Sequence, residues 1–173
     1  MSSNNLIHLA WGAWAVILLG VAAGAQQVPA ALQVPANEQL VVQVHAKGDQ
    51  IYSCKVDGSQ VGWTLKAPEA TLSNKDGKAF GKHLAGPSWE ASDGSRVVGK
   101  AAANAPSPDA ESIPWLLVKV VSHAGEGVLA QVTSIQRINT KGGKAPASGC
   151  DAAHAGQEVR VSYSADYLFF APK

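Results

Sequence analysis

The sequence lacks an excess of either charge. Its 14 Lys and Arg residues nearly balance its 13 Asp and Glu residues, which leaves a formal net charge of +1. Domains that bind nucleic acid usually carry a strong basic excess, so we expect no nucleic-acid partner. Charged residues make up only 16% of the chain and hydrophobic residues 46%. This balance excludes a disordered chain and is typical of a folded domain.

The short motifs of common enzyme classes are also missing. The sequence contains no GxSxG nucleophile elbow, no HExxH zinc motif, no Walker phosphate loop and no GxGxxG dinucleotide fingerprint. We therefore expect no cofactor. The histidines beyond the N-terminal segment are far apart in sequence, and only folding could bring them together as metal ligands, so we expect no metal site either. These histidines are His45, His83, His123 and His154.

An apolar run near the N-terminus predicts export. Residues 9–25 (LAWGAWAVILLGVAAGA) contain no charged side chain and end in small residues, which is typical of a secretory signal peptide. The preceding segment holds no Lys or Arg, so a retained membrane anchor is the alternative. We predict a signal peptide over 1–25, no stable membrane insertion after its cleavage, and a secreted or periplasmic protein. Residues 26–173 are close to the commonest size of a single domain.

The chain has only two cysteines, Cys54 and Cys150. In an oxidising compartment they can form one disulfide, which would close a loop of roughly 95 residues and tie an early segment to a late one. A metal pair and a catalytic thiol are the alternatives. The sequence has no CxxC motif, and no histidine lies within three residues of either cysteine. We therefore predict a structural disulfide.

Alternation with a period of two dominates the rest of the chain. Residues 51–56 and 61–65 each present one mainly apolar face, and the Asp-Gly turn signal between them predicts a β-hairpin. Further Asp-Gly pairs lie at 76–77 and 93–94. Longer apolar or alternating runs predict strands over 115–121, buried on both faces, over 129–138 and over 158–170. Residues 101–108 and 140–157 are expected to be long loops.

These patterns predict an all-β fold. We expect a single-domain antiparallel β-sandwich or barrel with long loops and one disulfide. Two Val-Pro dipeptides and the lack of periodicity predict an extended leader over 26–37 that lies on the domain surface, followed by the β domain over 38–173.

One unusual string supplies the candidate site residues. Residues 83–90 (HLAGPSWE) combine a Gly-Pro bend with His83, Trp89 and Glu90. An indole ring beside a carboxylate could stack on a sugar and bind its hydroxyls, although core packing of Trp89 is the simpler interpretation. Arg137 is a fourth candidate because it lies in an apolar strand. It could instead pair with Glu90 or Asp166 across the sheet.

Six strings in the same order resemble the DUF3455 family of exported bacterial and fungal proteins, to which no function is assigned. They are GDQIYSCKV (48–56), WxxxAPEATL (63–72), GKHLAGPSWEASDGSRVVGK (81–100), IPWLLVKV (113–120), IQRINTKGGKAP (135–146) and YSADYLFF (163–170). The resemblance implies that Cys54 and Cys150 are a recurring pair, and Leu84 stands where an aromatic residue is more usual. Some fungal members carry a dehydrogenase label, which we do not transfer because the dinucleotide fingerprint is absent.

We therefore expect a non-enzymatic exported domain that binds a carbohydrate, another small molecule or an envelope component. His83, Trp89, Glu90 and Arg137 are its candidate contacts. The first alternative is a secreted hydrolase of polysaccharides with Glu90 as general acid, which would require a second carboxylate facing the same cleft. Asp93 is a poor candidate for that second acid because it begins an Asp-Gly turn. The second alternative is a purely structural envelope protein.

Overall fold

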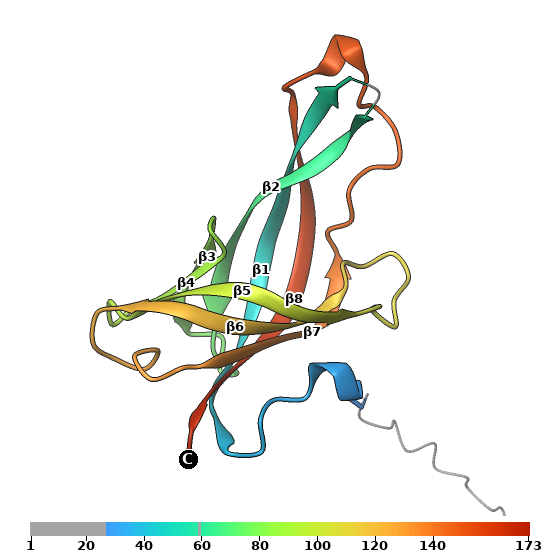
Figure 1. Cartoon of the computed structure of the whole chain (residues 1–173). Coiled ribbons are helices and arrows are strands. Elements are labelled where there is room, and N and C mark those ends of the chain that lie inside the picture. Colours follow the sequence, from blue (N-terminus) through green and yellow to red (C-terminus); the bar gives the residue numbers. More distant parts are fainter. Residues whose placement is uncertain (1–26, 59) are drawn as a thin grey trace, which may run out of the picture.

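The protein is a closed barrel of eight antiparallel strands in which each strand pairs with its neighbours in sequence and β8 pairs with β1 (Figure 1). The computed structural model describes residues 27–58 and 60–173. The strands are β1 (Glu38–Asp57), β2 (Gln60–Ser73), β3 (Ala79–Leu84), β4 (Ser88–Ala91), β5 (Arg96–Ala105), β6 (Trp115–Ala124), β7 (Ser134–Gly142) and β8 (Glu158–Pro172). The all-β prediction is confirmed, and the barrel is the form that the fold takes.

Helical structure in the described residues is limited to two short 3₁₀ turns, η1 (Ala30–Leu32) and η2 (Ala152–His154). No helix in this part of the chain is long and apolar enough to cross a membrane. The signal peptide predicted over 1–25 lies outside the described residues.

The Asp-Gly pairs form turns between strands, as the sequence predicts. Gly77 and Gly94 have φ values of 77° and 88°, a region in which a residue with a Cβ atom is strained. At the second of these turns, the Asp93 carboxylate accepts hydrogen bonds from the backbone N–H and the hydroxyl of Ser95. These bonds, of which the hydroxyl contributes most, lower the pKa of Asp93. Asp93 is therefore a turn residue.

Three expected boundaries were wrong. Residues 101–105 and 140–142, expected to lie in loops, complete β5 and β7, and residues 129–133, expected to be a strand, form part of the loop before β7. Leu129 and Val132 are fully buried in that loop and belong to the barrel core. Their apolar side chains close this end of the barrel. A residue in this position must be hydrophobic, and this is why the segment resembles a strand in sequence.

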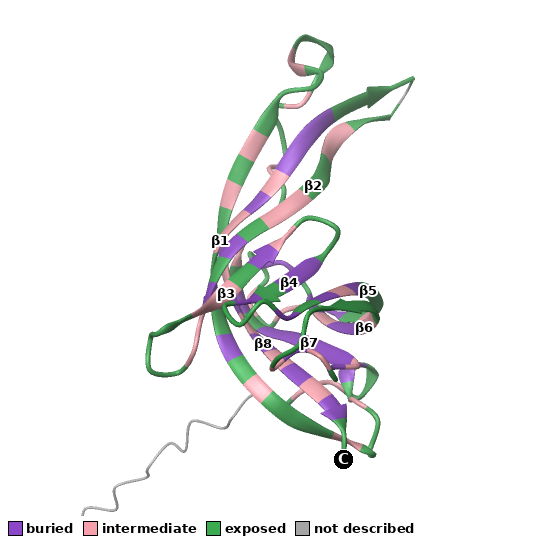
Figure 2. Cartoon of the chain, turned by 90° about the vertical axis from the view of Figure 1, so that its left-hand side faces the viewer, coloured by how far each residue is buried: buried purple, intermediate pink, exposed green. Residues whose placement is uncertain are grey.

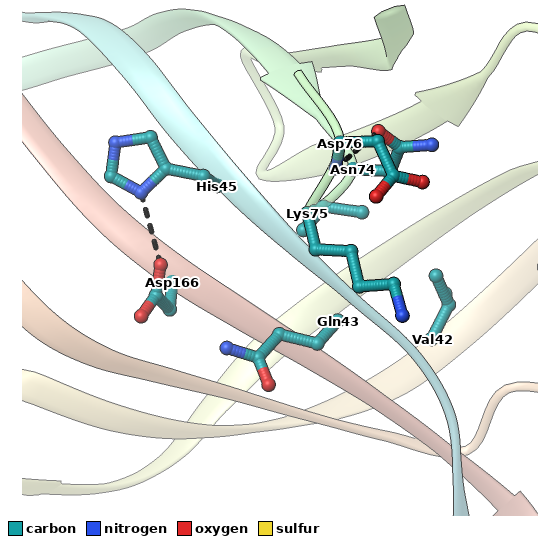
Figure 3. A pocket seen from close by; sticks show the side chains of 8 residues that line it. Val42, Gln43, His45, Asn74, Lys75, Asp76 and Asp166 are labelled. Carbon is teal, nitrogen blue, oxygen red and sulfur yellow. Dashed lines mark hydrogen bonds and ion pairs between the residues drawn. The ribbon is translucent and has the colours of Figure 1, made fainter. Parts of the chain in front are cut away.

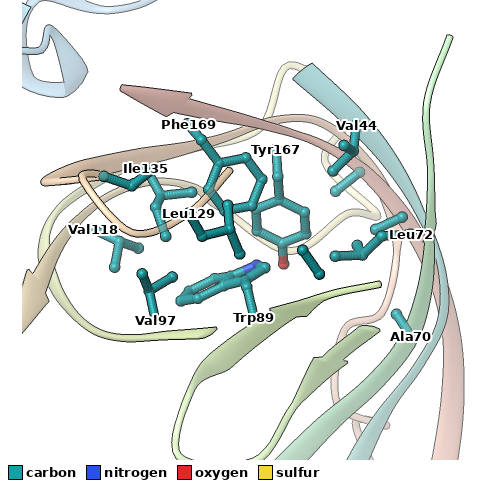
Figure 4. Close-up of a cluster of buried hydrophobic side chains, with 14 of the residues drawn as sticks. Val44, Ala70, Leu72, Trp89, Val97, Val118, Leu129, Ile135, Tyr167 and Phe169 are labelled. Carbon is teal, nitrogen blue, oxygen red and sulfur yellow. The ribbon is translucent and has the colours of Figure 1, made fainter. Parts of the chain in front are cut away.

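Alternate residues of each strand point into the barrel, and Figure 2 shows the resulting alternation of buried and exposed residues. Trp89, Tyr167 and Phe169 are the largest side chains of this core, and valine, leucine and isoleucine pack around them (Figure 4). Toward the opposite end the inward-facing residues are polar and include the buried side chains of Gln50, His83 and Arg137. The interior therefore has an apolar half and a polar half.

Three strands continue beyond the polar half of the barrel. β2 pairs with β1 over its whole length but with β3 only over Ala70–Ser73, and residues 158–162 of β8 pair with β1 alone. Residues 49–57, 60–69 and 158–162 thus form a three-stranded extension, which we call the arm (Figure 1). The predicted disulfide between Cys54 and Cys150 is present and fastens the loop over 143–157 to the arm.

The segment before β1 covers part of the outer surface of the barrel. Leu32 is fully buried in a second apolar cluster with Trp115, Leu117 and Ile138, and the Gln136 side chain donates a hydrogen bond to the Leu32 carbonyl at 2.7 Å. This cover explains why the first residues of β6 are buried on both faces. The prediction that residues 115–121 are buried on both faces is wrong further along the strand, where Val121 is 61% exposed.

Candidate ligand pocket inside the barrel

A small cavity lies in the polar half of the barrel interior. Its volume is about 200 Å³. Leu65 and Pro68 from the unpaired edge of β2, Pro87 from the β3–β4 turn and Ala101 from β5 lie at its mouth. The deeper walls are formed by Gln50, His83, Trp89, Leu116, Val118, Arg137 and Tyr167. Small barrels of this strand number have interiors that side chains fill or that hold one small ligand.

His83 and Trp89 form a stacked pair in the wall of this pocket. They are opposite each other in the β3–β4 register, with ring centroids 4.4 Å apart and ring planes 8° apart. Nδ1 of His83 lies 2.8 Å from the Ser88 carbonyl oxygen. A carbonyl can only accept, so Nδ1 carries the proton and donates. Burial lowers the pKa of His83 to about 4, so the ring is neutral at pH 7.

Arg137 places a buried positive charge in the opposite wall. The residue is only 9% exposed, and it is opposite Tyr167 in the β7–β8 register. Both Nε and Nη2 donate to the Pro114 carbonyl oxygen, at 3.2 and 2.8 Å. Within the described residues Arg137 forms no salt bridge, and no Asp or Glu lines the pocket. The guanidinium charge is therefore unbalanced at short range.

Several neighbouring polar atoms have no hydrogen-bond partner. Among the described residues, six buried side-chain nitrogen or oxygen atoms have no partner, and three of them belong to the pocket residues Gln50, Trp89 and Tyr167. A fourth is the Tyr163 hydroxyl, on the same inner face of β8 as Tyr167. The Tyr163 hydroxyl lies near the Gln50 amide and near Tyr167, and the Tyr167 hydroxyl lies near the Arg137 guanidinium, but none of these pairs forms a well-aligned hydrogen bond. Burial raises the pKa of both tyrosines, which keeps their hydroxyls protonated. Unpartnered buried polar atoms are rare in folded proteins and call for an explanation.

The loop after β7 helps to enclose this polar half. The Tyr52 hydroxyl donates to the Gly143 carbonyl at 2.6 Å. A Cβ atom on Gly143 would lie 2.8 Å from the Cβ of Tyr163 and 3.2 Å from the Cγ of Gln50, so the loop backbone packs directly on these side chains. The disulfide further along the loop holds this cover in place.

Three of the four sequence-predicted site residues line the pocket. His83, Trp89 and Arg137 do so, whereas Glu90 does not. Glu90 is exposed and lies between Lys82 and Arg96 in the strand register. Successive residues of a strand point to opposite faces, so inward-facing Trp89 requires outward-facing Glu90.

Trp89 and Arg137 do not make the contacts that the sequence analysis considered for them. Trp89 is 2% exposed and His83 covers one face of its ring, so the ring is not free to stack on a sugar. Figure 4 shows that the indole nitrogen points toward the Tyr167 hydroxyl. The alternative pairing of Arg137 with Glu90 or Asp166 is not formed. Asp166 lies on the outer face, where it accepts from His45 and Asn139.

Four residues in the polar half of the barrel were not singled out in the sequence analysis. They are Gln50, Tyr52, Tyr163 and Tyr167. Both tyrosines of β8 lie on the alternating apolar face recognised for 158–170, but alternation does not distinguish a hydroxyl that reaches a cavity from one that reaches solvent. Gln50 lies in β1 directly before the stretch over 51–56 that was recognised as a strand.

Grooves on the outer surface are weaker candidates. One of about 430 Å³ lies beside the β2–β3 turn and is lined by Gln43, His45, Asn74 and Asp166 (Figure 3). Several of its polar groups are already used within the fold: His45 Nδ1 lies 3.0 Å from the Asp166 carboxylate, and Asn74 accepts from two backbone N–H groups of its own turn. No cluster of three or more His, Cys, Asp or Glu side chains suited to a metal ion occurs in the described part of the chain.

The fold and the cavity define a class: a disulfide-linked, up-and-down eight-stranded β-barrel with a small interior pocket. The chain belongs to the DUF3455 family, whose model is described as a protein of unknown function and matches residues 35–171. The match begins after η1 and covers all of β1 to β7 and β8 up to its penultimate residue. No curated protein and no solved structure shows significant similarity to the chain.

Proposed function

We propose that this protein is an exported, non-enzymatic binding protein that holds one small molecule in the barrel pocket. The observation that carries the proposal is the group of unpartnered polar atoms around the cavity. A buried polar atom without a partner destabilises the fold by about 1–3 kcal/mol. Several such atoms around one cavity are best explained by a bound molecule that supplies their partners.

The size and shape of the cavity support this interpretation. Drug-sized ligands occupy pockets of roughly 300–1,000 Å³, and the present volume of about 200 Å³ suits a smaller compound. A polysaccharide chain would not fit inside. The ligand class supported best is therefore a small molecule, and the mouth beside the free edge of β2 offers its route from solvent.

The pocket chemistry favours binding over catalysis. His83 is neutral with its pKa near 4, and its Nδ1 proton is held by the Ser88 carbonyl. The tyrosine hydroxyls have raised pKa values. Proton transfer is most effective when the pKa of the catalytic group lies near the working pH, and these groups are far from neutrality. No observation favours the hydrolase alternative, because Glu90 points away from the pocket.

Export is the second part of the proposal. Disulfides persist in oxidising compartments and are rare in the cytosol, so the Cys54–Cys150 bridge supports a secreted or periplasmic location. The apolar run over residues 9–25 supports it independently.

The test is to block the mouth of the pocket without disturbing the core. Ala101 is exposed and lines the mouth, whereas its neighbour Ala102 is exposed and does not line the pocket. Full-length wild type, Ala101→Phe and Ala102→Phe are produced in an exporting host and compared by native mass spectrometry. We expect a retained small molecule in the wild type and in Ala102→Phe, and at least a tenfold lower occupancy in Ala101→Phe. Equal occupancy in both variants, or a wild type that neither retains a compound nor responds to a small-molecule panel in thermal-shift assays, would contradict the proposal.

A further inference from the structure

The charge balance of the pocket identifies the chemical class of its ligand. Arg137 is the one charged residue that lines the cavity, and the lining contains no acidic side chain. A buried charge without a counter-ion is strongly unfavourable. The Pro114 carbonyl accepts two of its N–H bonds but carries no net charge, so it satisfies donors without neutralising the guanidinium.

The remaining polar groups around the cavity are also donors. Nε2 of Gln50 and Nε1 of Trp89 can only donate, and neither has an acceptor in good hydrogen-bond geometry. The Gln50 amide lies near the Tyr163 hydroxyl, and the indole nitrogen points toward that of Tyr167 (Figure 4). The Tyr167 hydroxyl is protonated and its oxygen lies near Arg137 and Tyr163, whereas its proton has no aligned acceptor, so it is available to donate as well. A group of donors around one cation is complementary to an anion rich in acceptor oxygens.

The number of charges favours a monoanion. His83 is neutral and therefore adds no second cation. A phosphate dianion would leave a net negative charge buried in the barrel, whereas a carboxylate matches the single guanidinium. Planar guanidinium and carboxylate groups also match geometrically. Of the N–H groups of Arg137 that Pro114 does not use, one side lies near the Tyr167 hydroxyl, and no aligned hydrogen bond occupies them.

The other walls of the cavity are apolar. Leu65 and Pro68 at the mouth and Leu116 in the wall offer no hydrogen bond to a ligand. They suit a short hydrocarbon or ring attached to the anionic group. The small volume of about 200 Å³ limits the size of that apolar part.

We infer that the pocket binds a small amphipathic monocarboxylate, whose carboxylate pairs with Arg137 and whose apolar part lies against Leu65, Pro68 and Leu116. The inference rests on the proposed function, because it names the ligand of the same pocket. It assigns to Arg137 the role of the specificity-determining residue.

The first arm of the test compares charged and uncharged molecules of equal shape on the full-length wild type. Benzoate is compared with benzamide, and hexanoate with hexanol, by isothermal titration calorimetry at pH 7. Inorganic sulfate, which is fully dianionic at pH 7, is included as the dianionic probe. We expect at least one carboxylate to bind about 10- to 100-fold more tightly than its uncharged analogue, which is the range for hydrogen bonds to charged groups. We expect no binding of sulfate.

The second arm changes the charge of the pocket. Arg137→Met removes the cation at similar length, and Lys82→Met removes one cation from the exposed outer face of β3 as the matched control. Arg137→Met is expected to abolish the preference for the carboxylate and to leave the Tm of the ligand-free protein unchanged or higher, because a buried unpaired charge is lost. Lys82→Met is expected to retain the preference. If Arg137→Met does not fold, Arg137→Lys retains the charge without the planar fork, and we expect it to retain part of the preference.

Two negative outcomes are distinguishable. Equal affinity of the wild type for carboxylates and their uncharged analogues, or a neutral molecule retained by the native protein, overturns the inference and leaves the proposed binding function intact. Preference for carboxylates that survives in Arg137→Met also overturns it. A wild type that retains nothing and binds none of the probes contradicts the proposed function itself.

Discussion

His83 and Trp89 stack face to face from neighbouring strands inside the barrel, with only 8° between their ring planes. The stack leaves His83 almost fully buried, with one ring nitrogen bonded to the Ser88 carbonyl. Burial is the largest cause of its lowered pKa, and the nearby charge of Arg137 acts in the same direction. The folded barrel therefore favours the neutral ring over a wide range of pH.

This relationship predicts a specific acid sensitivity. The pKa of His83 is about 4 in the folded protein and about 6.5 in an unfolded chain, so the unfolded state binds the proton first as the pH falls. The free energy of unfolding therefore includes a stabilising contribution from neutral His83 that is fully present above about pH 6.5. This contribution decreases as the pH falls from 6.5 to 4. Between pH 7 and pH 4 the loss amounts to about 3 kcal/mol.

The measurement is urea unfolding of wild type and His83→Gln at both pH values. Gln cannot titrate but can still donate a hydrogen bond to Ser88. The free energy of unfolding of the wild type should fall by about 3 kcal/mol more than that of the variant. Parallel pH profiles for the two proteins would show that His83 is protonated equally in the folded and unfolded states.

The neighbouring pair Trp89 and Glu90 gives a second prediction. Trp89 fills the barrel core and Glu90 faces solvent. We expect Trp89→Ala to reduce the free energy of unfolding by about 3–5 kcal/mol, and Glu90→Ala to change it by less than about 0.5 kcal/mol. Chemical denaturation of both variants is the measurement. A large loss of stability in Glu90→Ala would mean that the carboxylate has a structural partner.

The sequence predicted those parts of the molecule that depend on local patterns. Asp-Gly turns, the alternation in β8 and the single possible cysteine pair each identified a real feature, because turn geometry, strand burial and oxidation follow from nearby residues or from elimination. The pocket half was only partly accessible. His83 and Trp89 lie in one distinctive string, but Arg137 joins them only when β7 closes the barrel against β8.

The errors have equally physical causes. Leu129 and Val132 have the hydrophobicity of a strand because they close the barrel end, and no local signal separates the two roles. Glu90 was grouped with Trp89 because adjacent residues look close in a sequence, although a strand places them on opposite faces. The first half of β1 was missed because its outer residues, such as Leu40 and Val41, are apolar and hide the alternation.

The segment before β1 provides a third prediction. Leu32 is fully buried against the outer face of β6, whereas Leu40 at the start of β1 is 50% exposed. We expect Leu32→Ala to reduce the free energy of unfolding by about 2–5 kcal/mol and Leu40→Ala by less than about 0.5 kcal/mol. Urea denaturation of full-length protein compares the two leucines directly. Equal, small effects would indicate that this segment does not hold its place on the barrel in solution.

The disulfide provides the last prediction, in which a global and a local effect can be separated. The bridge joins residues 96 positions apart, and closing so long a loop restricts the unfolded chain by up to about 4–5 kcal/mol. We expect Cys54→Ala/Cys150→Ala to lose stability within that limit.

The local effect should be confined to the arm and its loop, because the barrel strands keep their own pairing without the bridge. By contrast, without the bridge the loop over 143–157 is attached to the arm by fewer hydrogen bonds than join the barrel strands. One of them runs from the Trp63 indole N–H to the Ser148 carbonyl at 2.9 Å. Hydrogen exchange should therefore show faster exchange in this loop and in the arm, at denaturant concentrations where the barrel amides stay protected. Uniform loss of protection across the chain would instead show that arm and barrel unfold as one cooperative unit.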